Sequence, residues 1–299
     1  MINENFLREV NALGADCVVN SPMKEHTTFR IGGPADYFIT VYNKEQLKSL
    51  ISFCKQSSIE YMILGNGSNL LVNDLGLRKA VIRLAGEFKE ISHSGTTITC
   101  GAGLTLARLC SYAMQNSLTG LEFAFGIPGT VGGAVYMNAG AYGGEMKDVL
   151  TEVTHLSKDG EIETVKADTL HLSYRYSDYV KNGGVILFAH YTLKRGNKED
   201  IKALMDDIMN RRVTKQPLEF PSAGSVFKRP KDAFAGTLIE QCGLKGCTVG
   251  GAQVSIKHAG FIINIGNATC EDVMNLVEHI QTTVKKETGI SLEREIIPI

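Results

Sequence analysis

Several hallmarks of common protein classes are absent from this sequence of 299 residues. Its seven cysteines form no Cys-x-x-Cys pair and its seven histidines no His-Glu-x-x-His motif, so we expect no metal site. No block of like charge occurs, and a net charge of -1 argues against nucleic acid as a partner. Neither a membrane-spanning apolar run nor the apolar core of a secretory signal is present. We therefore expect a cytoplasmic protein without membrane insertion.

What the sequence does contain is typical of a globular protein. Hydrophobic residues make up 43% and charged residues 21% of the chain. The length exceeds that of one compact core, so we expect two or three packed units of about 100 to 150 residues. Disorder is not expected.

The first half of the chain alternates strand and helix patterns. Residues 36–41 predict a strand, and the apolar positions 47, 50, 51 and 54 predict a helix over 44–57. Further short strands are expected at 61–64 and 80–84, and a second helix at 104–116.

The second half changes to alternating strands between 151 and 193, with a hairpin turn at Lys158-Asp159-Gly160. A charged helix is predicted from 198 to about 213, and Lys215-Gln216-Pro217 ends it at the clearest domain boundary. Thr269 and Asp272 form a capping box for a long helix that stops at Gly289. Residues 292–299 alternate as a terminal strand, which would place Glu293 and Glu295 on one face.

Two nearly uncharged glycine-rich segments, 65–72 and 126–133, are the most informative feature. Glycine lets the backbone approach a ligand closely, and inward-facing amides can bind a pyrophosphate without lysine. Neither segment has the Rossmann or P-loop pattern. Either one alone is equally well explained as a tight turn between strands. Two of them followed by the similar segment 136–143 favour contact with a ligand.

These segments and five other motifs resemble those of the UDP-N-acetylenolpyruvoylglucosamine reductase family, and they follow one another in the order found in that family. The other motifs are Thr27 to Ala35, Ser173 to Ser177, Ala223 to Lys228, Gly243 to Gly246 and Gly250 to Ala252. The resemblance extends from about Asn20 to the carboxyl end. It implies an α+β fold with a two-lobed FAD-binding domain of the vanillyl-alcohol-oxidase-like type and a C-terminal α+β substrate-binding domain.

The resemblance further implies domains at 1–196, with lobes of about 1–85 and 86–196, and at 197–299. The terminal strand either stays in the second domain or packs back on the first lobe. FAD would be bound without a covalent link, and NADPH would be the co-substrate. The residues implied to bind FAD are Arg30, Gly65, Asn66, Gly67, Ser68, Asn69, Leu70, Gly126, Ile127, Pro128, Gly129, Thr130, Gly132, Gly133, Asn138, Ala139, Gly140 and Ala141.

The implied reaction is reduction of UDP-N-acetylglucosamine enolpyruvate to UDP-N-acetylmuramate, a cytoplasmic step of peptidoglycan precursor synthesis. Arg175 resembles the arginine that stabilises the developing carbanion, and Glu295 its carboxyl partner, which must be protonated to donate a hydrogen bond. Ser225 resembles the proton donor. Spacing alone does not separate Glu295 from Glu293. Weaker candidates for holding the substrate are Tyr142, Arg212, Lys215, Lys228 and His258.

Three departures and two alternatives accompany this interpretation. The short spacing between Arg175 and Ser225 resembles the shorter form of the family, which lacks a tyrosine-bearing closing loop, while Arg229 and Ile297 differ from many members. One alternative is a flavoenzyme that oxidises another small alcohol or sugar. The other is a catalytically silent module that binds a nucleotide sugar and no flavin.

Overall fold

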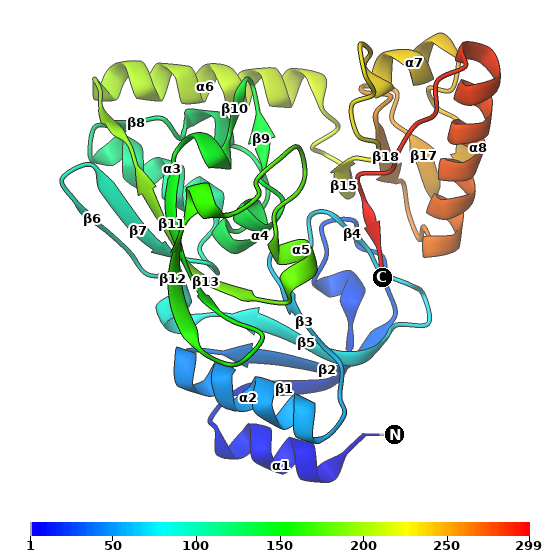
Figure 1. Ribbon diagram of the computed structural model, residues 1–299. Coiled ribbons are helices and arrows are strands. Elements are labelled where there is room, and N and C mark those ends of the chain that lie inside the picture. The colour runs from blue at the N-terminus through cyan, green and yellow to red at the C-terminus, as the bar shows by residue number, and fades with distance from the viewer. Residues whose placement is uncertain (1) are drawn as a thin grey trace. The chain divides into compact units, whose positions relative to one another are not determined.

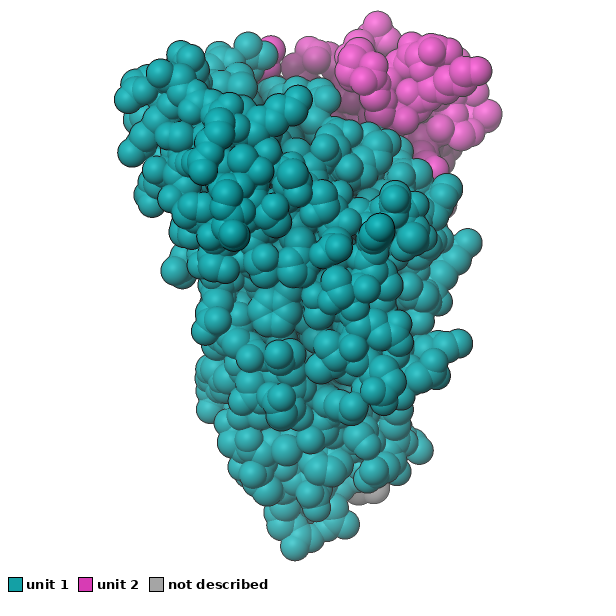
Figure 2. Space-filling view, turned by 60° about the vertical axis from the view of Figure 1, so that its left-hand side comes forward, with its two compact units in different colours: residues 1–19, 37–66, 79–211 teal, residues 20–36, 67–78, 212–299 magenta. Residues whose placement is uncertain are grey.

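Helices and strands are mixed along the chain in the computed structural model, which describes residues 2–299 (Figure 1). Contacts divide the chain into two compact units, coloured separately in Figure 2. Unit 1 is Met1–Val19, Tyr37–Asn66 and Lys79–Arg211, and unit 2 is Asn20–Asp36, Gly67–Arg78 and Arg212–Ile299. The sequence predicts an FAD-binding part, 1–196, and a substrate-binding part, 197–299. This division by ligand stays a prediction.

Unit 1 contains an antiparallel sheet of five strands in the order β12-β11-β13-β7-β6. The turn predicted at 158–160 joins β11 to β12 and places Leu156 opposite Ile162, as expected. Leu187 and Ala189 of β13 are buried, as their alternation predicts. The strands are β6 (Ile91–Ser94), β7 (Thr97–Gly101), β11 (Leu150–Leu156), β12 (Ile162–Lys166) and β13 (Val185–Thr192).

A second sheet has the order β1-β2-β5-β3, and β3 lies parallel to β5 with Tyr61 opposite Ala80. The helix predicted after β2 begins where the Asn43 side chain accepts the Gln46 N–H, and its four predicted apolar positions are all buried. The elements are α1 (Glu4–Ala12), β1 (Asp16–Pro22), β2 (Pro34–Val41), α2 (Lys44–Gln56), β3 (Tyr61–Leu64) and β5 (Leu77–Leu84).

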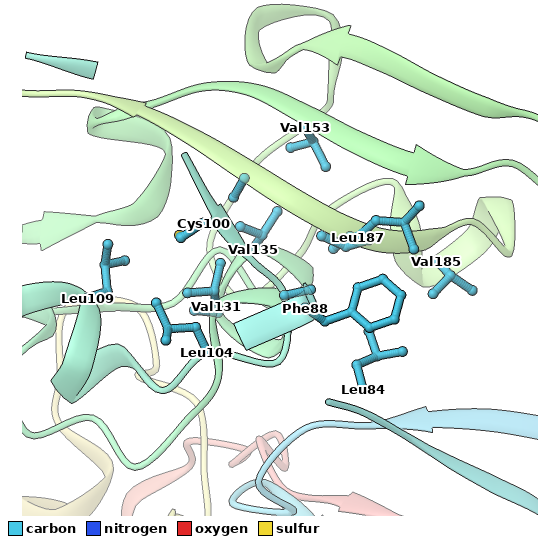
Figure 3. Close-up of a cluster of buried hydrophobic side chains, with 14 of the residues drawn as sticks. Leu84, Phe88, Cys100, Leu104, Leu109, Val131, Val135, Val153, Val185 and Leu187 are labelled. Atoms are coloured by element: carbon cyan, nitrogen blue, oxygen red, sulfur yellow. The ribbon is translucent and has the colours of Figure 1, made fainter. Parts of the chain in front are cut away.

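The core of unit 1 fixes one end of the second glycine segment. Val131 and Val135 of the short helix α4 (Val131–Tyr136) lie in one buried cluster with Leu104, Leu109 and Leu187 (Figure 3). Leu109 belongs to α3 (Leu106–Gln115). Burying each such side chain contributes about 1.5–3 kcal/mol. Because α4 is anchored this way, the loop that precedes it has a fixed end.

Unit 2 has a sheet in the order β15-β18-β17-β16, with Val273, Val277 and Val284 of α8 in its core. The predicted capping box between Thr269 and Asp272 begins α8, and its C-cap Gly289 has a φ of 74°. The elements are β15 (Ser222–Ser225), α7 (Ala235–Gln241), β16 (Thr248–Val249), β17 (Ala252–Val254), β18 (Phe261–Asn264) and α8 (Cys270–Thr288). The charged helix α6 is Lys198–Lys215.

The tail forms two short pairings instead of the predicted continuous strand over 292–299. Arg294 bridges Phe227, and β19 (Ile297–Pro298) pairs in parallel with β4 (Leu70–Leu71). Because Phe227 and β4 are separate stretches of the chain, the tail pairs with them in two short pieces and not as one strand. The remaining short elements are β8 (Leu118–Thr119), β9 (Gly140–Ala141), β10 (Gly144–Glu145), α5 (Tyr179–Asn182) and β14 (Lys194–Arg195). Within residues 2–299, no helix combines the length and apolarity needed to cross a bilayer.

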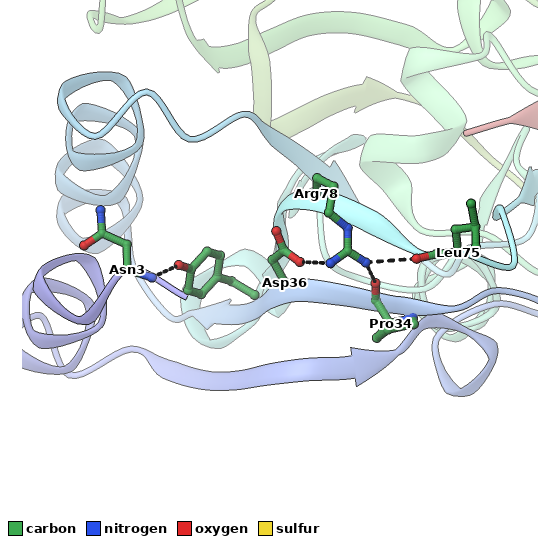
Figure 4. A network of polar contacts seen from close by, with 6 residues as sticks. Asn3, Pro34, Asp36, Leu75 and Arg78 are labelled. Carbon is green, nitrogen blue, oxygen red and sulfur yellow. Dashed lines mark hydrogen bonds and ion pairs between the residues drawn. The ribbon is translucent and has the colours of Figure 1, made fainter. Parts of the chain in front are cut away.

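Polar contacts tie loops to strands within each unit (Figure 4). In unit 2, Arg78 forms an ion pair with Asp36 and donates to the carbonyls of Leu75 at 2.9 Å and Pro34 at 3.3 Å. In unit 1, the N–H of Asn3 donates to the Tyr37 hydroxyl at 2.6 Å. Arg78 is an exposed cation, so its pair with Asp36 contributes little stability and mainly fixes the geometry of the loop.

Two histidines of the five-stranded sheet predict a loss of stability in acid. Burial lowers the pKa of His155, which shares a 3.0 Å hydrogen bond with Tyr179, and that of His190. Since the unfolded chain keeps a pKa near 6.5, it binds more protons than the folded chain, and stability should fall as pH drops below about 6.5. Denaturant unfolding at about pH 7.5 and 5.5 measures this fall. His155→Gln should weaken the pH dependence; an unchanged slope would contradict the assignment.

Candidate active site

In unit 1, the first two residues of the first glycine segment, Gly65 and Asn66, lie against the second segment. The Asn66 side chain donates from Nδ2 to the Pro128 carbonyl at 2.8 Å. A Cβ atom at Gly65 would come within 2.5 Å of the Thr130 hydroxyl oxygen. Glycine at 65 is therefore required by this approach. The shared role that the sequence predicts for the two segments stays a prediction, and Gly65 and Asn66 lie beside residues 128–130.

The second segment is held by backbone hydrogen bonds to the connection between β7 and α3. Gly129 accepts from Leu106 at 3.0 Å, and the N–H groups of Val131 and Gly132 donate to Leu104 and Ala102, both at 2.8 Å. Thr130, which caps α4, is buried. These bonds make the segment a rigid loop.

Residues 67–70 continue the first segment in unit 2. Gly67 is buried with a φ of 60°, and a Cβ there would lie 2.4 Å from the His26 carbonyl oxygen. Within residues 2–299, no hydrogen bond occupies the N–H groups of Gly67, Ser68 or Asn69. Gly67 is buried, and a buried N–H group requires an acceptor; three consecutive donors suit the oxygens of a phosphate. These residues therefore fit the diphosphate of a dinucleotide.

Unit 2 places the two predicted catalytic residues Ser225 and Glu295 on neighbouring segments. The Glu295 N–H donates to the carbonyl of Val226 at 2.8 Å. The Ser225 hydroxyl, at the end of β15, donates to the Phe227 carbonyl at 3.2 Å. Asn69 connects the tail to the glycine segment, because its side chain donates to the Glu295 carbonyl at 3.1 Å.

The alternative carboxylate, Glu293, has a different environment. Its carboxylate forms an ion pair with Lys228, whose N–H also donates to the Glu293 carbonyl at 2.8 Å. The Glu293 side chain is 73% exposed. Lys228, predicted to bind substrate, is thus engaged by Glu293. This pairing favours Glu295 as the catalytic candidate.

Arg175 lies at the tip of a tight turn in unit 1. The N–H and carbonyl groups of Ser173 and Tyr176 form two reciprocal hydrogen bonds of 3.1 Å, which leaves Tyr174 and Arg175 between them. The Arg175 guanidinium lies 4.9 Å from the centre of the Tyr174 ring. Arg175, predicted to be catalytic, is therefore on a short, well-defined turn and belongs to unit 1, whereas Ser225 and Glu295 belong to unit 2.

Unusual backbone conformations gather at the predicted site residues. Arg30, Asn138, Tyr142 and Arg175 are four of nine non-glycine residues with positive φ among the described residues. Their φ values lie between 41° and 55°. Such conformations are costly for residues with a side chain and often accompany functional sites. Sequence reasoning did not predict them.

The remaining predicted residues have diverse settings. Ala139 to Ala141 lead into and form β9, Arg212 is buried near the end of α6 and donates to Gln216 at 3.4 Å, and Lys215 is exposed. His258 accepts from the Gly260 N–H at 3.1 Å, and burial lowers its pKa. His258 is thus a neutral, structurally bonded ring. Among the described residues, no three His, Cys, Asp or Glu side chains are grouped to hold a metal ion.

Comparison with known proteins identifies the family. Residues 216–299 match the model of the UDP-N-acetylenolpyruvoylglucosamine reductase C-terminal domain, and residues 35–166 match an FAD binding domain. A UDP-N-acetylenolpyruvoylglucosamine reductase of Caldanaerobacter subterraneus subsp. tengcongensis is 49% identical over 278 residues, 93% of this chain and 92% of the relative. The chain belongs to the UDP-N-acetylenolpyruvoylglucosamine reductase family.

Other members of the family agree in sequence and structure. The reductase of Clostridium botulinum (strain Eklund 17B / Type B) is 49% identical over 277 residues, 93% of this chain and 91% of its own. The crystal structure of the reductase from Thermus caldophilus superimposes with a TM-score of 0.82 at 39% identity, covering 95% of this chain and 98% of that one. The predicted family and fold class are confirmed.

Two acidic residues near the predicted site residues, Glu145 and Asp74, were not predicted from the sequence. Both accept hydrogen bonds from other parts of the chain. Glu145 accepts a hydrogen bond from Asn138 at 2.6 Å, and the carboxylate of Asp74 accepts from the first N–H groups of α8, Cys270 at 2.9 Å and Glu271 at 3.3 Å. No motif marks either acid in the sequence. For Glu145, the one usable signal is its place two residues after the Tyr142-Gly143 turn.

Proposed function

We propose that the chain is a UDP-N-acetylmuramate dehydrogenase. It reduces UDP-N-acetylglucosamine enolpyruvate to UDP-N-acetylmuramate with NADPH and non-covalently bound FAD, in peptidoglycan precursor synthesis. The observation that carries the proposal is 49% identity to a reductase over 93% of the chain. The match of residues 35–166 to an FAD binding domain supports the cofactor.

The flavin would be held mainly by backbone donors. Gly67, Ser68 and Asn69 offer three consecutive N–H groups, and Gly126 to Gly133 supply the rigid loop. Neutral loops suffice because N–H dipoles satisfy the diphosphate. When bound, FAD would supply the chemistry of hydride transfer between NADPH and the enolpyruvyl substrate. Arg30, Asn66, Leu70 and residues 139–141 complete the proposed cofactor set, together with the backbone of Asn138, whose side chain bonds within the chain.

Arg175 and Glu295 are proposed to stabilise the charge that develops beside the substrate carboxylate. A guanidinium stays protonated and can form two parallel hydrogen bonds with a carboxylate-like group. A donor placed in advance lowers the barrier because it needs no rearrangement as the charge appears. The rigid turn that carries Arg175 supports this role.

Ser225 is proposed to donate the proton that completes the reduction. A hydroxyl is a weak acid, but it is adequate toward a strongly basic carbanion. The Ser225 hydroxyl donates to the Phe227 carbonyl at 3.2 Å, which is long for a hydrogen bond between two oxygens. A substrate can therefore replace this carbonyl as its partner. Glu295 on the adjoining segment supports the assignment of both residues.

Tyr142, Arg212, Lys215, Lys228 and His258 are proposed to hold the substrate. The uridine diphosphate and carboxylate are anions, so local cations compensate for a net charge near zero. Only Arg212, Lys215 and Lys228 are cations; Tyr142 would contribute its hydroxyl and His258 its neutral ring as hydrogen-bonding groups. We assign residues 1–196 to FAD binding and 197–299 to substrate binding.

Purified protein is expected to be yellow and to release FAD when denatured. NADPH oxidation should depend on added UDP-N-acetylglucosamine enolpyruvate. Absorption spectra and a spectrophotometric assay measure both. Flavin reduction by a simple alcohol, with no response to the enolpyruvyl sugar, would indicate the alternative oxidase instead. A colourless protein that binds no added FAD would indicate a nucleotide-sugar-binding module.

A further inference from the structure

The side chain of Asn138 is used entirely within unit 1. It is 1% exposed, and its Nδ2 donates to the Glu145 carboxylate at 2.6 Å and to the Ser173 carbonyl at 3.1 Å. Its Oδ1 accepts the Lys147 N–H at 2.9 Å. The orientation of the amide follows from these partners, because two acceptors face the amino group and one donor faces the oxygen. The side chain therefore joins its own segment to two others.

One of these segments is the turn that carries Arg175. Ser173, which accepts from Asn138, is the first residue of the reciprocal pair that closes the turn. On the other flank, the fully buried Ser177 donates to the Tyr136 carbonyl at 2.6 Å. Both sides of the turn are thus fastened to residues 136–138. The position of Arg175 follows from that attachment.

The second segment is the β9-β10 hairpin. Glu145 lies in β10 opposite Gly140, and the two-residue turn between the strands is Tyr142-Gly143. The Glu145 carboxylate also forms an ion pair with Lys147 at 2.7 Å. Asn138 therefore connects the turn bearing Arg175 to the hairpin bearing Tyr142.

We infer that Asn138 is a positioning residue that holds Arg175 in its catalytic place. The inference rests on the proposed function, in which Arg175 stabilises charge on the substrate. Asparagine suits the junction because one amide serves two acceptors and one donor. Serine at 138 would leave buried partners without a hydrogen bond, and the turn would move to satisfy them. Misplacement of a catalytic group by about 1 Å costs about 100-fold in rate.

A double-mutant cycle tests the coupling. In single-turnover experiments, Arg175→Ala should slow oxidation of the reduced holoenzyme by the enolpyruvyl substrate about 100- to 1000-fold. Asn138→Ser alone should slow the same step about 100-fold. If Asn138 acts through Arg175, the double variant should be no slower than Arg175→Ala. Multiplication of the two losses would overturn the inference.

Asn264→Ser is the matched control for lost stability. Asn264 is also buried, and its side chain bonds to the backbone of Phe29 at 3.2 Å, Gly266 at 3.0 Å and Ala268 at 3.2 Å. Any loss of rate that it causes should multiply with that of Arg175→Ala. Non-additivity in the control as well would mean that the cycle reports stability, and the positioning role would fail. A wild-type protein that never turns over the enolpyruvyl sugar would instead refute the proposed function.

Asn138→Asp provides a second variant with nearly the same shape. Its new carboxyl group faces the Glu145 carboxylate and the Ser173 carbonyl, and it can donate to them only when protonated. Burial and the neighbouring negative charge raise the pKa of such a group. Its rate relative to wild type should therefore rise as pH falls. A pH profile parallel to that of the wild type would contradict the inference.

Discussion

Replacing Ser225 with alanine is expected to slow oxidation of the reduced enzyme by the enolpyruvyl substrate by about 10²- to 10⁴-fold. Flavin reduction by NADPH should continue, because that half-reaction requires no proton from Ser225. Stopped-flow absorbance separates the two half-reactions. The selective loss follows from the role of the hydroxyl as the donor to the carbanion.

Ser222→Ala is the control, since Ser222 begins the same strand, β15. Its backbone carbonyl accepts from the Thr28 hydroxyl at 2.7 Å, and the substitution keeps that carbonyl. It should alter substrate-driven oxidation far less than Ser225→Ala. Equal damage to both half-reactions in Ser225→Ala would remove the proton-donor assignment.

Gly67→Ala should cause loss of flavin together with a large loss of stability. A Cβ at this position would lie 2.4 Å from the His26 carbonyl oxygen and 2.9 Å from the Thr27 Cα, and both atoms are backbone. Relieving the overlap would displace the segment whose N–H groups face the proposed diphosphate. Overpacking of this kind costs about 1–3 kcal/mol or more. The ratio of FAD to protein and denaturant unfolding measure the two effects.

Gly95→Ala is the control that separates the collision of the new Cβ from the cost of a positive φ. Gly95 has a φ of 62°, against 60° for Gly67, but a Cβ there meets nothing within 4 Å. Both substitutions carry the cost of a left-handed conformation, about 1–2 kcal/mol. Only Gly67→Ala adds the collision. Equal losses of flavin and stability in the two variants would argue against a close-packed cofactor loop.

Local patterns predicted much of the secondary structure. Helix α2 followed from four apolar positions and α8 from a capping box with a terminal glycine, because these signals depend on neighbouring residues. The tail was predicted less well. Alternation from 292 to 299 indicated one strand, yet its two partners, Phe227 and β4, are distant in sequence. Strand pairing between residues so far apart in the sequence cannot be predicted from the local pattern of hydrophobic residues.

The candidate site shows the same limit. Glycine motifs and the family resemblance predicted cofactor segments and a role for Arg175, and these stay predictions, but they gave no side-chain directions. Asn138 was assigned to the cofactor, and nothing in the sequence indicated that its amide faces Glu145 and Ser173. Likewise, spacing did not separate Glu293 from Glu295. The structure adds that Glu293 forms an ion pair with Lys228, which favours Glu295 as the proposed catalytic residue.

The discontinuous make-up of unit 2 has a consequence for synthesis on the ribosome. Phe29, Ile31 and Leu71 are buried in a core completed by residues from 223 to 296. These early apolar side chains must wait in solvent or on a chaperone until more than half the protein has been translated. Expression of residues 212–299 alone would omit both early segments and leave that core unfilled.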